Sequence, residues 1–232
     1  MLKLDTYAVH SFINANENLM RFYNWWLDNS LSISHPYHNL RHTLGMMYHV
    51  IRIYRDSKNR QMPEYPDGMS EFDLYILLTS TMFHDFNHSA GRFSDAINIM
   101  HAKDGLRTCL ETFLPEGHEQ TEIYRLCSKN IDATQYPYVI DDSELDVQQR
   151  IMRECDILVY LYDDFFTQCM MGLMQEMRKT DKSEFLVADL KFILECVKKF
   201  KLSYSMKTWT DNQDSFLTEV NVISNIFQLR KP

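Results

Sequence analysis

Histidine is the most informative residue type in this chain, because two dense groups stand out among its nine histidines. The segment 35–42 reads His-Pro-Tyr-His-Asn-Leu-Arg-His, and the segment 84–88 reads His-Asp-Phe-Asn-His. Scattered histidines are usually surface or core residues, whereas two dense groups beside apolar runs are not expected by chance. The pattern favours a metal site built from both segments.

The spacing within each group suggests how its side chains would be arranged. His38 and His42 are four residues apart, as are His84 and His88. On a helix, such pairs share one face, about one turn apart. Asp85 follows His84 directly and would lie about 100° further round the same helix. Imidazole and carboxylate together suit zinc or a first-row metal, and the carboxylate can also bridge to Mg²⁺ or Mn²⁺.

Two histidines and one aspartate leave such a site short of ligands, so a later helix should supply another carboxylate. Asp156 is the best candidate, since it lies in the apolar sequence Glu-Cys-Asp-Ile-Leu over 154–158. A carboxylate among apolar residues is costly unless it is paired or bound to a cation. The sequence therefore predicts that Asp156 completes the ligand set.

Composition indicates what kind of scaffold positions these residues. Glycine and proline together number 12 of 232 residues, against a usual share of about 12%. Because sheets with many turns need both residues, we expect one all-α domain over 1–232. The apolar spacing predicts helices over 4–28, 38–55, 71–88, 94–112, 119–131, 144–163, 165–179, 184–200 and 212–229. The segment 57–70 should be a loop, either a connector or a rim of the site, and Asp211 or Asn212 should cap the last helix.

Charge and cysteine content narrow the functional class. The net charge of −8 argues against a protein that coats a nucleic-acid polymer. Five cysteines without a Cys-x-x-Cys pair indicate free, mostly buried thiols in a reducing compartment. The start of the chain lacks an apolar leader, and no stretch approaches about 18 apolar residues. We therefore expect a cytoplasmic protein that acts on a small molecule and does not associate with a membrane.

In their order, these segments resemble the HD superfamily of metal-dependent phosphohydrolases. Residues 37–43, Tyr-His-Asn-Leu-Arg-His-Thr, are similar to the YHNxxHA signature of the cyclic nucleotide phosphodiesterase catalytic domain. The segment 84–88 is similar to its HDxDH motif, 131–134 to its ILAT segment and 154–156 to its second aspartate motif. The resemblance covers roughly 35–160, and more weakly the rest. It implies a compact helical bundle of the phosphodiesterase type.

The resemblance also implies a role for each residue of the site. His38 would be the general acid, and His88 would lie near the attacking water. Two divalent ions, Zn, Mn, Mg or Fe, would be bound, with Asp85 bridging them. The ligands of the tighter ion would be His42, His84, Asp85 and Asp156. A small nucleotide with a cyclic phosphodiester would be opened to a nucleoside monophosphate.

Three departures from the family pattern affect the expected site. Asn87 replaces an aspartate, which would weaken the environment of the second metal. Gln135 replaces another aspartate, and Asp189 replaces the glutamine that holds the purine. Gln135 and Asp189 are therefore candidate substrate residues. Since an amide donates and accepts whereas a carboxylate only accepts, base recognition should differ from that of the family.

Two other functions stay open at this point. One is an HD-type phosphohydrolase acting on nucleoside mono- or triphosphates, which the short chain and Asp189 favour. The other is an inactive binder of signalling nucleotides. Asp95 and Asn98 are candidates to support the site, and His49 is expected to be a satisfied helix histidine. Three aromatic residues are either base-stacking or core residues: Tyr136, Tyr138 and Phe165. The base and the oligomeric state are left unassigned.

Overall fold

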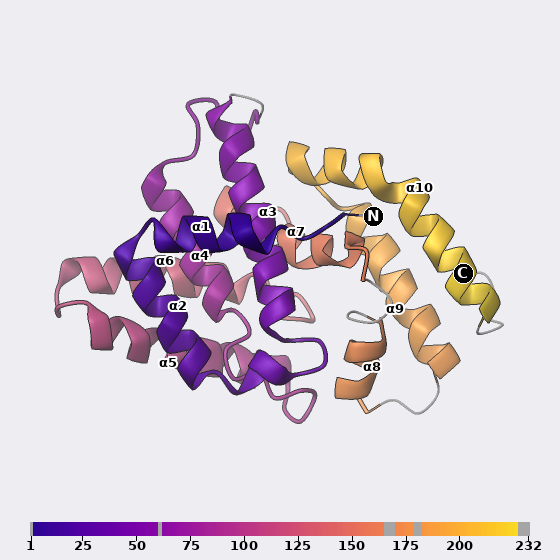
Figure 1. Cartoon of the computed structure of the whole chain (residues 1–232), viewed down its shortest axis with the longest axis horizontal. Coiled ribbons are helices and arrows are strands. Elements are labelled where there is room, and N and C mark those ends of the chain that lie inside the picture. Colours follow the sequence, from indigo (N-terminus) through magenta and orange to yellow (C-terminus); the bar gives the residue numbers. More distant parts are fainter. Residues whose placement is uncertain (1, 60–61, 165–169, 179–181, 227–232) are drawn as a thin grey trace.

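The computed structural model of the chain describes residues 2–59, 62–164, 170–178 and 182–226 (Figure 1). Within these ranges it contains ten α-helices and no strand, which confirms the all-α prediction. A single isolated bridge joins Leu2 to Tyr162. The helices are Thr6–Asn14 (α1), Glu17–Asn29 (α2), Leu40–Lys58 (α3), Glu71–Phe83 (α4), Asp95–Phe113 (α5), His118–Asp132 (α6), Val147–Leu158 (α7), Gly172–Glu176 (α8), Lys182–Val197 (α9) and Ser203–Ile226 (α10).

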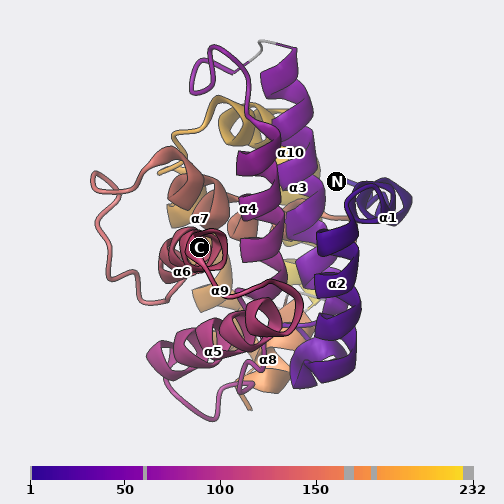
Figure 2. The ribbon, with the colours of Figure 1, turned by 90° about the vertical axis from the view of Figure 1, so that its left-hand side faces the viewer.

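Helix α4 forms the centre of the bundle, as its nearly unbroken apolar run predicts. It begins with a capping box, in which Ser70 and Asp73 exchange side-chain and backbone hydrogen bonds. From Leu74 onward almost every side chain is buried. Helices α2, α3, α5, α6 and α7 all pack against it, and Figure 2 shows α3 and α4 side by side. This core holds the ends of α3, α4 and α7 together.

Several boundaries differ from the prediction because of capping interactions. The expected helix 4–28 is two helices, since the Asn16 side chain accepts a hydrogen bond from Leu19 N and starts α2. The expected helix 144–163 ends at Leu158 and continues as a short 3-10 helix, Val159–Leu161. Helix α10 begins nine residues before 212, so the predicted caps Asp211 and Asn212 lie within it.

The segment 57–70 behaves as a connector. Met62 and Met69 are buried in the core, and Glu64 accepts hydrogen bonds from the Ser203 backbone N–H at 2.6 Å and from its hydroxyl at 2.8 Å. Glu64 thereby satisfies donors at the start of α10 from a distant part of the chain. None of the described residues of this segment lines the cavity beside His84 and Asp156 or the hollow beside Trp25 and Phe86, both described below.

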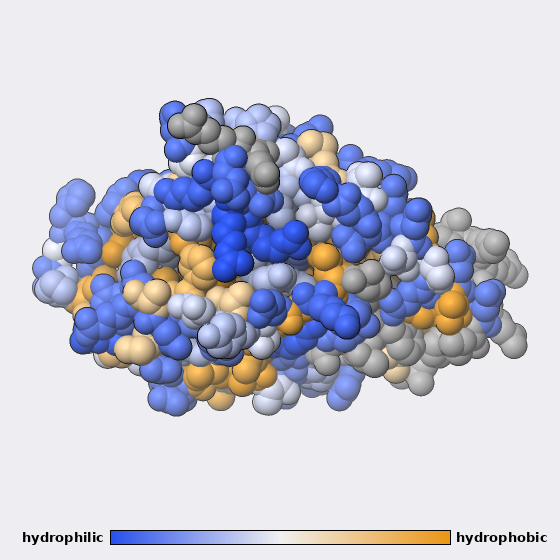
Figure 3. All heavy atoms as spheres, turned by 45° about the horizontal axis from the view of Figure 1, so that its top comes forward, coloured by the Kyte–Doolittle hydropathy of each residue, from blue (hydrophilic) through white to orange (hydrophobic). Residues whose placement is uncertain are grey.

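The polar surface and the free cysteines are those expected from the composition. Hydrophilic side chains predominate on the face in Figure 3, where apolar ones form small patches. None of the described helices is both long and apolar enough to cross a membrane. The four described cysteines are free, and three of them are buried: Cys109, Cys127 and Cys155.

A buried carboxylate on α7 also supports the start of α10, and its removal should lower stability. Glu154 accepts hydrogen bonds from the backbone N–H groups of Lys201 at 2.8 Å and Leu202 at 3.2 Å. Glu154→Ala leaves these donors unpaired, so we expect a loss of about 2 kcal/mol in the free energy of unfolding, measured with urea. Glu154→Gln keeps an acceptor and should lose less than about 1 kcal/mol.

The exposed Glu195 on α9 provides the matched control, because Glu195→Ala should leave stability within about 0.5 kcal/mol. Equal losses in Glu154→Ala and Glu154→Gln would contradict the capping interpretation, since they would assign the effect to the charge.

Candidate metal centre

His42 is positioned by the cap of α3. The Asn39 side chain accepts a hydrogen bond from His42 N at 3.1 Å, and its amide donates to the carbonyls of His35 and Pro36. Asparagine is favoured at this position because its oxygen satisfies a free N–H of the first turn. His38 therefore precedes the helix, and the prediction that it shares a helix face with His42 is wrong.

His84 is the C-cap of α4, so the second predicted helical pair is also wrong. The chain leaves the helix through residues with positive φ, namely Asn87 at 54°, Ala90 at 52° and Gly91 at 73°. Asparagine and glycine enter this region readily. Asn87 also accepts a hydrogen bond from Leu31 N at 2.8 Å. Its side chain thus supports the turn and lines a hollow away from the predicted ligands.

The four predicted metal ligands converge even though the helical pairs are absent. His42 Nε2 lies 3.2 Å from His84 Nε2, 3.1 Å from an oxygen of Asp156 and 3.4 Å from an oxygen of Asp85. His84 Nε2 lies 2.9 Å from Asp85. The two histidines are almost fully buried. One ligand atom each of His42, His84 and Asp156 lies within 4.8 Å of the others, a spacing that could hold a metal ion.

The hydrogen bonding of His84 fits a metal ligand. Its Nδ1 lies 2.7 Å from the carbonyl oxygen of Thr81 and donates a hydrogen bond to it. In the neutral imidazole this leaves Nε2 with a lone pair that faces His42 and Asp85, an arrangement typical of metal-binding histidines. Burial lowers the pKa of His84, but Asp85 and Asp156 together raise it to about 9. The cluster therefore attracts positive charge, as a proton or as a metal cation.

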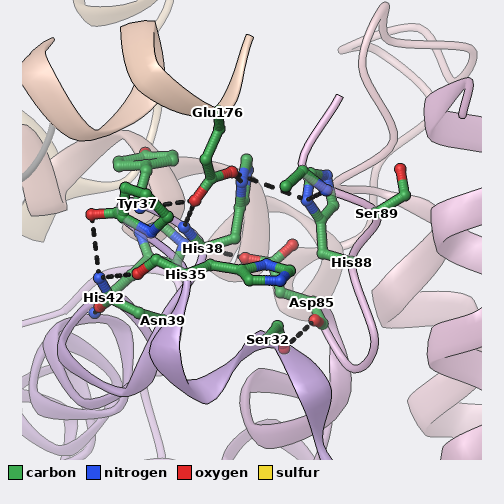
Figure 4. A network of polar contacts seen from close by, with 12 residues as sticks. Ser32, His35, Tyr37, His38, Asn39, His42, Asp85, His88, Ser89 and Glu176 are labelled. Atoms are coloured by element: carbon green, nitrogen blue, oxygen red, sulfur yellow. Dashed lines mark hydrogen bonds and ion pairs between the residues drawn. The ribbon is translucent and has the colours of Figure 1, made fainter. Parts of the chain in front are cut away.

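Glu176 is a residue of the site that sequence reasoning missed. It comes from α8 and approaches His38 from the side opposite α3 (Figure 4). Its carboxylate accepts hydrogen bonds from Tyr37 N at 2.5 Å and His38 N at 2.8 Å, and lies 2.5 Å from His38 Nδ1. Its sequence signal is weak, because Glu176 is a lone acid in the methionine-rich run 170–177, whose spacing is also that of ordinary core packing.

His38, His88 and the carboxylates around them shift one another's pKa values. Burial alone would raise the pKa of Glu176, but the hydrogen bonds from His38 and the backbone hold it below its ordinary value. Burial and His88 lower the pKa of His38, while Asp85 and Glu176 oppose this, and the net direction is downward. Glu176 is therefore an ionised carboxylate that orients the His38 ring through Nδ1 and leaves Nε2 for other partners.

A glycine allows Glu176 to approach so closely. A Cβ at Gly172 would lie 2.9 Å from the carbonyl carbon of Pro36 and closer still to its oxygen. Because the obstacle is backbone, it cannot move aside as a flexible side chain can. Glycine at this position lets α8 pack directly on the segment that carries His38.

His88 lies between His38 and the next helix. Its ring is 3.6 Å from that of His38, centroid to centroid, and its Nε2 is 3.8 Å from Asp95. Burial lowers the pKa of His88, but Asp95 and other carboxylates raise it overall. Asn98 accepts a hydrogen bond from Ser89 N at 3.0 Å. Asp95 and Asn98 thus hold the segment that follows the His-Asp motif.

Two further groups of side chains have the spacing of metal ligands. One contains His38, Asp85 and His88, and the other contains His35, His88 and Glu176. The first group adjoins the four-ligand cluster through Asp85. By contrast, His49 is buried elsewhere, and its Nδ1 lies 2.9 Å from the hydroxyl of Tyr204. Its Nε2 is buried without a hydrogen bond in the described part of the chain, so the expected satisfied histidine is satisfied at one nitrogen only.

A cavity of about 540 Å³ opens directly onto these groups, within the usual size range of small-molecule sites. The predicted site residues on its wall are His38, His84, Asp85, His88, Asp156 and Asp189. Gln135 is not part of this wall, although its neighbours Thr134 and Tyr136 are. Tyr138 also lines it, and Tyr136 is half exposed rather than in the core. Phe165 lies outside the described residues.

A second hollow of about 660 Å³ lies on the other side of His88. Trp25, Phe86 and Arg92 are among the residues that line it, and it does not include the four predicted ligands. The smaller cavity is therefore the one that combines the ligand cluster with an apolar wall.

Fold and site together define a helical protein with a His, Asp and Glu cluster that could hold metal at the base of a small-molecule cavity. Neither a scan against models of known protein families nor a search of curated proteins finds a match for this sequence.

Proposed function

We propose that this protein is a metal-dependent phosphohydrolase that opens the cyclic phosphodiester of a small nucleotide to give a nucleoside monophosphate. The observation that carries the proposal is one juxtaposition. Ligand atoms of His84, Asp85 and Asp156 lie within 3.4 Å of His42 Nε2. His38, whose Nδ1 is held by Glu176, stands on the wall of the cavity that His84, Asp85 and Asp156 also line. The sequence resemblance to the HD phosphohydrolases supports the same reaction.

The residues present fit a divalent metal, as the tautomer of His84 and the convergent carboxylates indicate. We infer that His42, His84, Asp85 and Asp156 would hold the first ion, and that Asp85 would also contact a second ion held otherwise mostly by water. Two such ions supply charge neutralisation for a phosphate and a lower pKa for water. Zinc, manganese, magnesium and iron are all compatible with this ligand set.

His38 supplies the proton for the leaving group in this proposal. Water loses a proton to the solvent and forms a new bond to phosphorus, the bond from phosphorus to the sugar oxygen breaks, and Nε2 of His38 gives its proton to that oxygen. His38 then regains a proton from the solvent. Glu176 holds the ring through Nδ1 and favours the protonated form by its charge. The negative charge of the bound phosphate adds to this effect and offsets the burial that lowers the pKa of His38.

The experiment that tests the proposal is a substrate panel. The purified protein is incubated with Mn²⁺ and, in turn, with 3′,5′-cyclic nucleotides, nucleoside monophosphates and nucleoside triphosphates, and the products are separated by chromatography. We expect a nucleoside monophosphate from a cyclic substrate. Release of inorganic phosphate or pyrophosphate from the linear nucleotides alone would favour the other HD-type activity. Tight binding without any product would favour a nucleotide-binding protein.

Glu176 should be needed for turnover. Glu176→Gln keeps the bulk and one acceptor for the backbone N–H groups but places a neutral amide against His38 Nδ1. Because the amide no longer favours the imidazolium, we expect turnover of the cyclic substrate to fall at least about 10-fold, and by no more than the contribution of general acid catalysis, about 10²–10⁴-fold. Steady-state kinetics with a metal analysis measure this.

Glu184, an acid on α9 that is absent from the cavity wall, provides a matched control, and Glu184→Gln should keep its turnover. Unchanged turnover in Glu176→Gln would contradict the proposed role of the His38–Glu176 pair.

We further infer that the protein works in a reducing compartment such as the cytoplasm. The free state of Cys109, Cys127, Cys155 and Cys196 supports this setting.

A further inference from the structure

Asp189 is a buried carboxylate that faces the cavity without a partner. It lies on α9, is 7% exposed, and lines the cavity that also contains His84, Asp85 and Asp156. Its Oδ2 is buried without a hydrogen bond from any residue in the described part of the chain. Buried polar groups are nearly always hydrogen-bonded. An unpaired carboxylate on a cavity wall therefore indicates that a bound ligand supplies the missing donor.

No positively charged side chain in the described part of the chain is paired with this carboxylate. Asp164, for comparison, is paired with the Arg41 guanidinium at 2.8 Å, whereas no ion pair is formed by Asp189 with the residues that the structure describes. Burial is the one cause that shifts its pKa, and it raises the pKa to about 7. At neutral pH the ionised form is thus readily available, and both of its oxygens are hydrogen-bond acceptors.

The walls beside Asp189 suit a flat aromatic ring. Phe185 and Phe192 come from the same helix, and Tyr136 contributes a ring whose centroid is 5.0 Å from that of Phe192. Aromatic rings of this kind bind planar bases by stacking and edge contacts. The cavity therefore combines a metal-ligand cluster, an aromatic wall and one unpaired carboxylate.

We propose that Asp189 determines base specificity by accepting two hydrogen bonds from the adjacent N–H donors of guanine, at N1 and at the 2-amino group. This inference rests on the proposed function, because the base belongs to the nucleotide whose phosphate is held at the ligand cluster. It also departs from the family, where an amide holds the purine.

The hydrogen-bonding edges of the other bases do not match a carboxylate. Adenine and cytosine each place one amino donor beside a ring nitrogen that accepts, and this nitrogen would face a carboxylate oxygen. Hypoxanthine keeps the N1 donor but lacks the 2-amino group. Hydrogen bonds to an ionised partner are roughly twice as strong as neutral ones, so guanine gains two of them and hypoxanthine one. The preference should therefore follow the order guanine, hypoxanthine, adenine.

Equilibrium binding of mononucleotides tests this assignment without any hydrolysis. Calorimetry at pH 8 with Mn²⁺ compares guanosine, inosine and adenosine 5′-monophosphates. We expect each lost hydrogen bond to weaken binding about 10- to 100-fold. Asp189→Asn offers one donor and one acceptor in nearly the same shape, so it should lose most of its affinity for the guanine nucleotide and bring the three ligands within about 10-fold. The exposed Asp214 on α10 gives the control, and Asp214→Asn should bind as the wild type does.

Equal binding of the three nucleotides by the wild type, or an unchanged guanine preference in Asp189→Asn, would overturn the assignment of Asp189. No binding of the guanine nucleotide at millimolar concentration would overturn it as well. The phosphohydrolase proposal fails separately: guanine-selective binding without turnover of any cyclic substrate would contradict the activity alone, and turnover without base preference would contradict the role of Asp189 alone.

Discussion

His38→Ala is expected to slow hydrolysis of the cyclic nucleotide by about 10²–10⁴-fold, the usual contribution of a general acid, while leaving fold and metal content unchanged. His38 lies outside the four-ligand cluster around His42, and its Nδ1 is already engaged by Glu176. Its removal therefore takes away a proton donor rather than one of the four ligands. Steady-state kinetics, circular dichroism and metal analysis measure the three quantities.

The loss should depend on the leaving group, which separates proton donation from other roles. A cyclic nucleotide expels a poor alkoxide that needs a proton, whereas an activated aryl phosphate ester expels a stable phenolate that does not. His38→Ala should therefore lose far more activity on the natural substrate than on the activated one. An equal loss on both would instead make His38 a positioning residue or a metal ligand, and His88 would be the next candidate for the proton donor.

Asp156→Ala should remove the bound metal and, with it, the activity. Its oxygen lies 3.1 Å from His42 Nε2 and supplies the cluster with a carboxylate from α7. Loss of residues that merely support metal ligands typically costs about 10–100-fold in affinity or activity, so loss of a ligand should cost at least that much. Elemental analysis and turnover of the same preparation check the two effects together.

Asp163 provides the matched control for this variant. It is exposed and does not line the cavity, so Asp163→Ala should keep the wild-type metal content and activity. An Asp156→Ala protein that retains a full complement of metal and normal turnover would contradict the proposed ligand set.

The chemistry of residue types located the candidate site but did not select its ligands. The two histidine groups, Asp85 and Asp156 stood out because a buried imidazole or carboxylate needs a partner, and the apolar runs beside them predict burial. The choice of His42 and His84 as the ligands came from the resemblance to the HD phosphohydrolases. The helical bundle was likewise predictable, since apolar periodicity and the shortage of glycine and proline are properties of the sequence itself. The central place of α4 follows from its uniformly apolar composition.

Local geometry at the site was predictable only in part. The two pairs with four-residue spacing indicated shared helix faces, yet Asn39 begins α3 after His38, and the chain leaves α4 before Asp85. Asn39 is a strong N-cap residue and could have been read as one. The turn after His84 depends also on the hydrogen bond between Asn87 and Leu31, 56 residues apart, which no local pattern reveals.

The sequence by itself thus determined the residue chemistry, the helical class and the ligand candidates, because these depend on side-chain type and short-range spacing. Tertiary structure alone decided that Glu176, 138 residues beyond His38, would orient its ring, and that Asp189 would face the same cavity as Asp156. The physical reason is that burial, hydrogen-bond pairing and charge at a site are set by packing between distant helices. The order of residues along the chain does not give the distances between those helices.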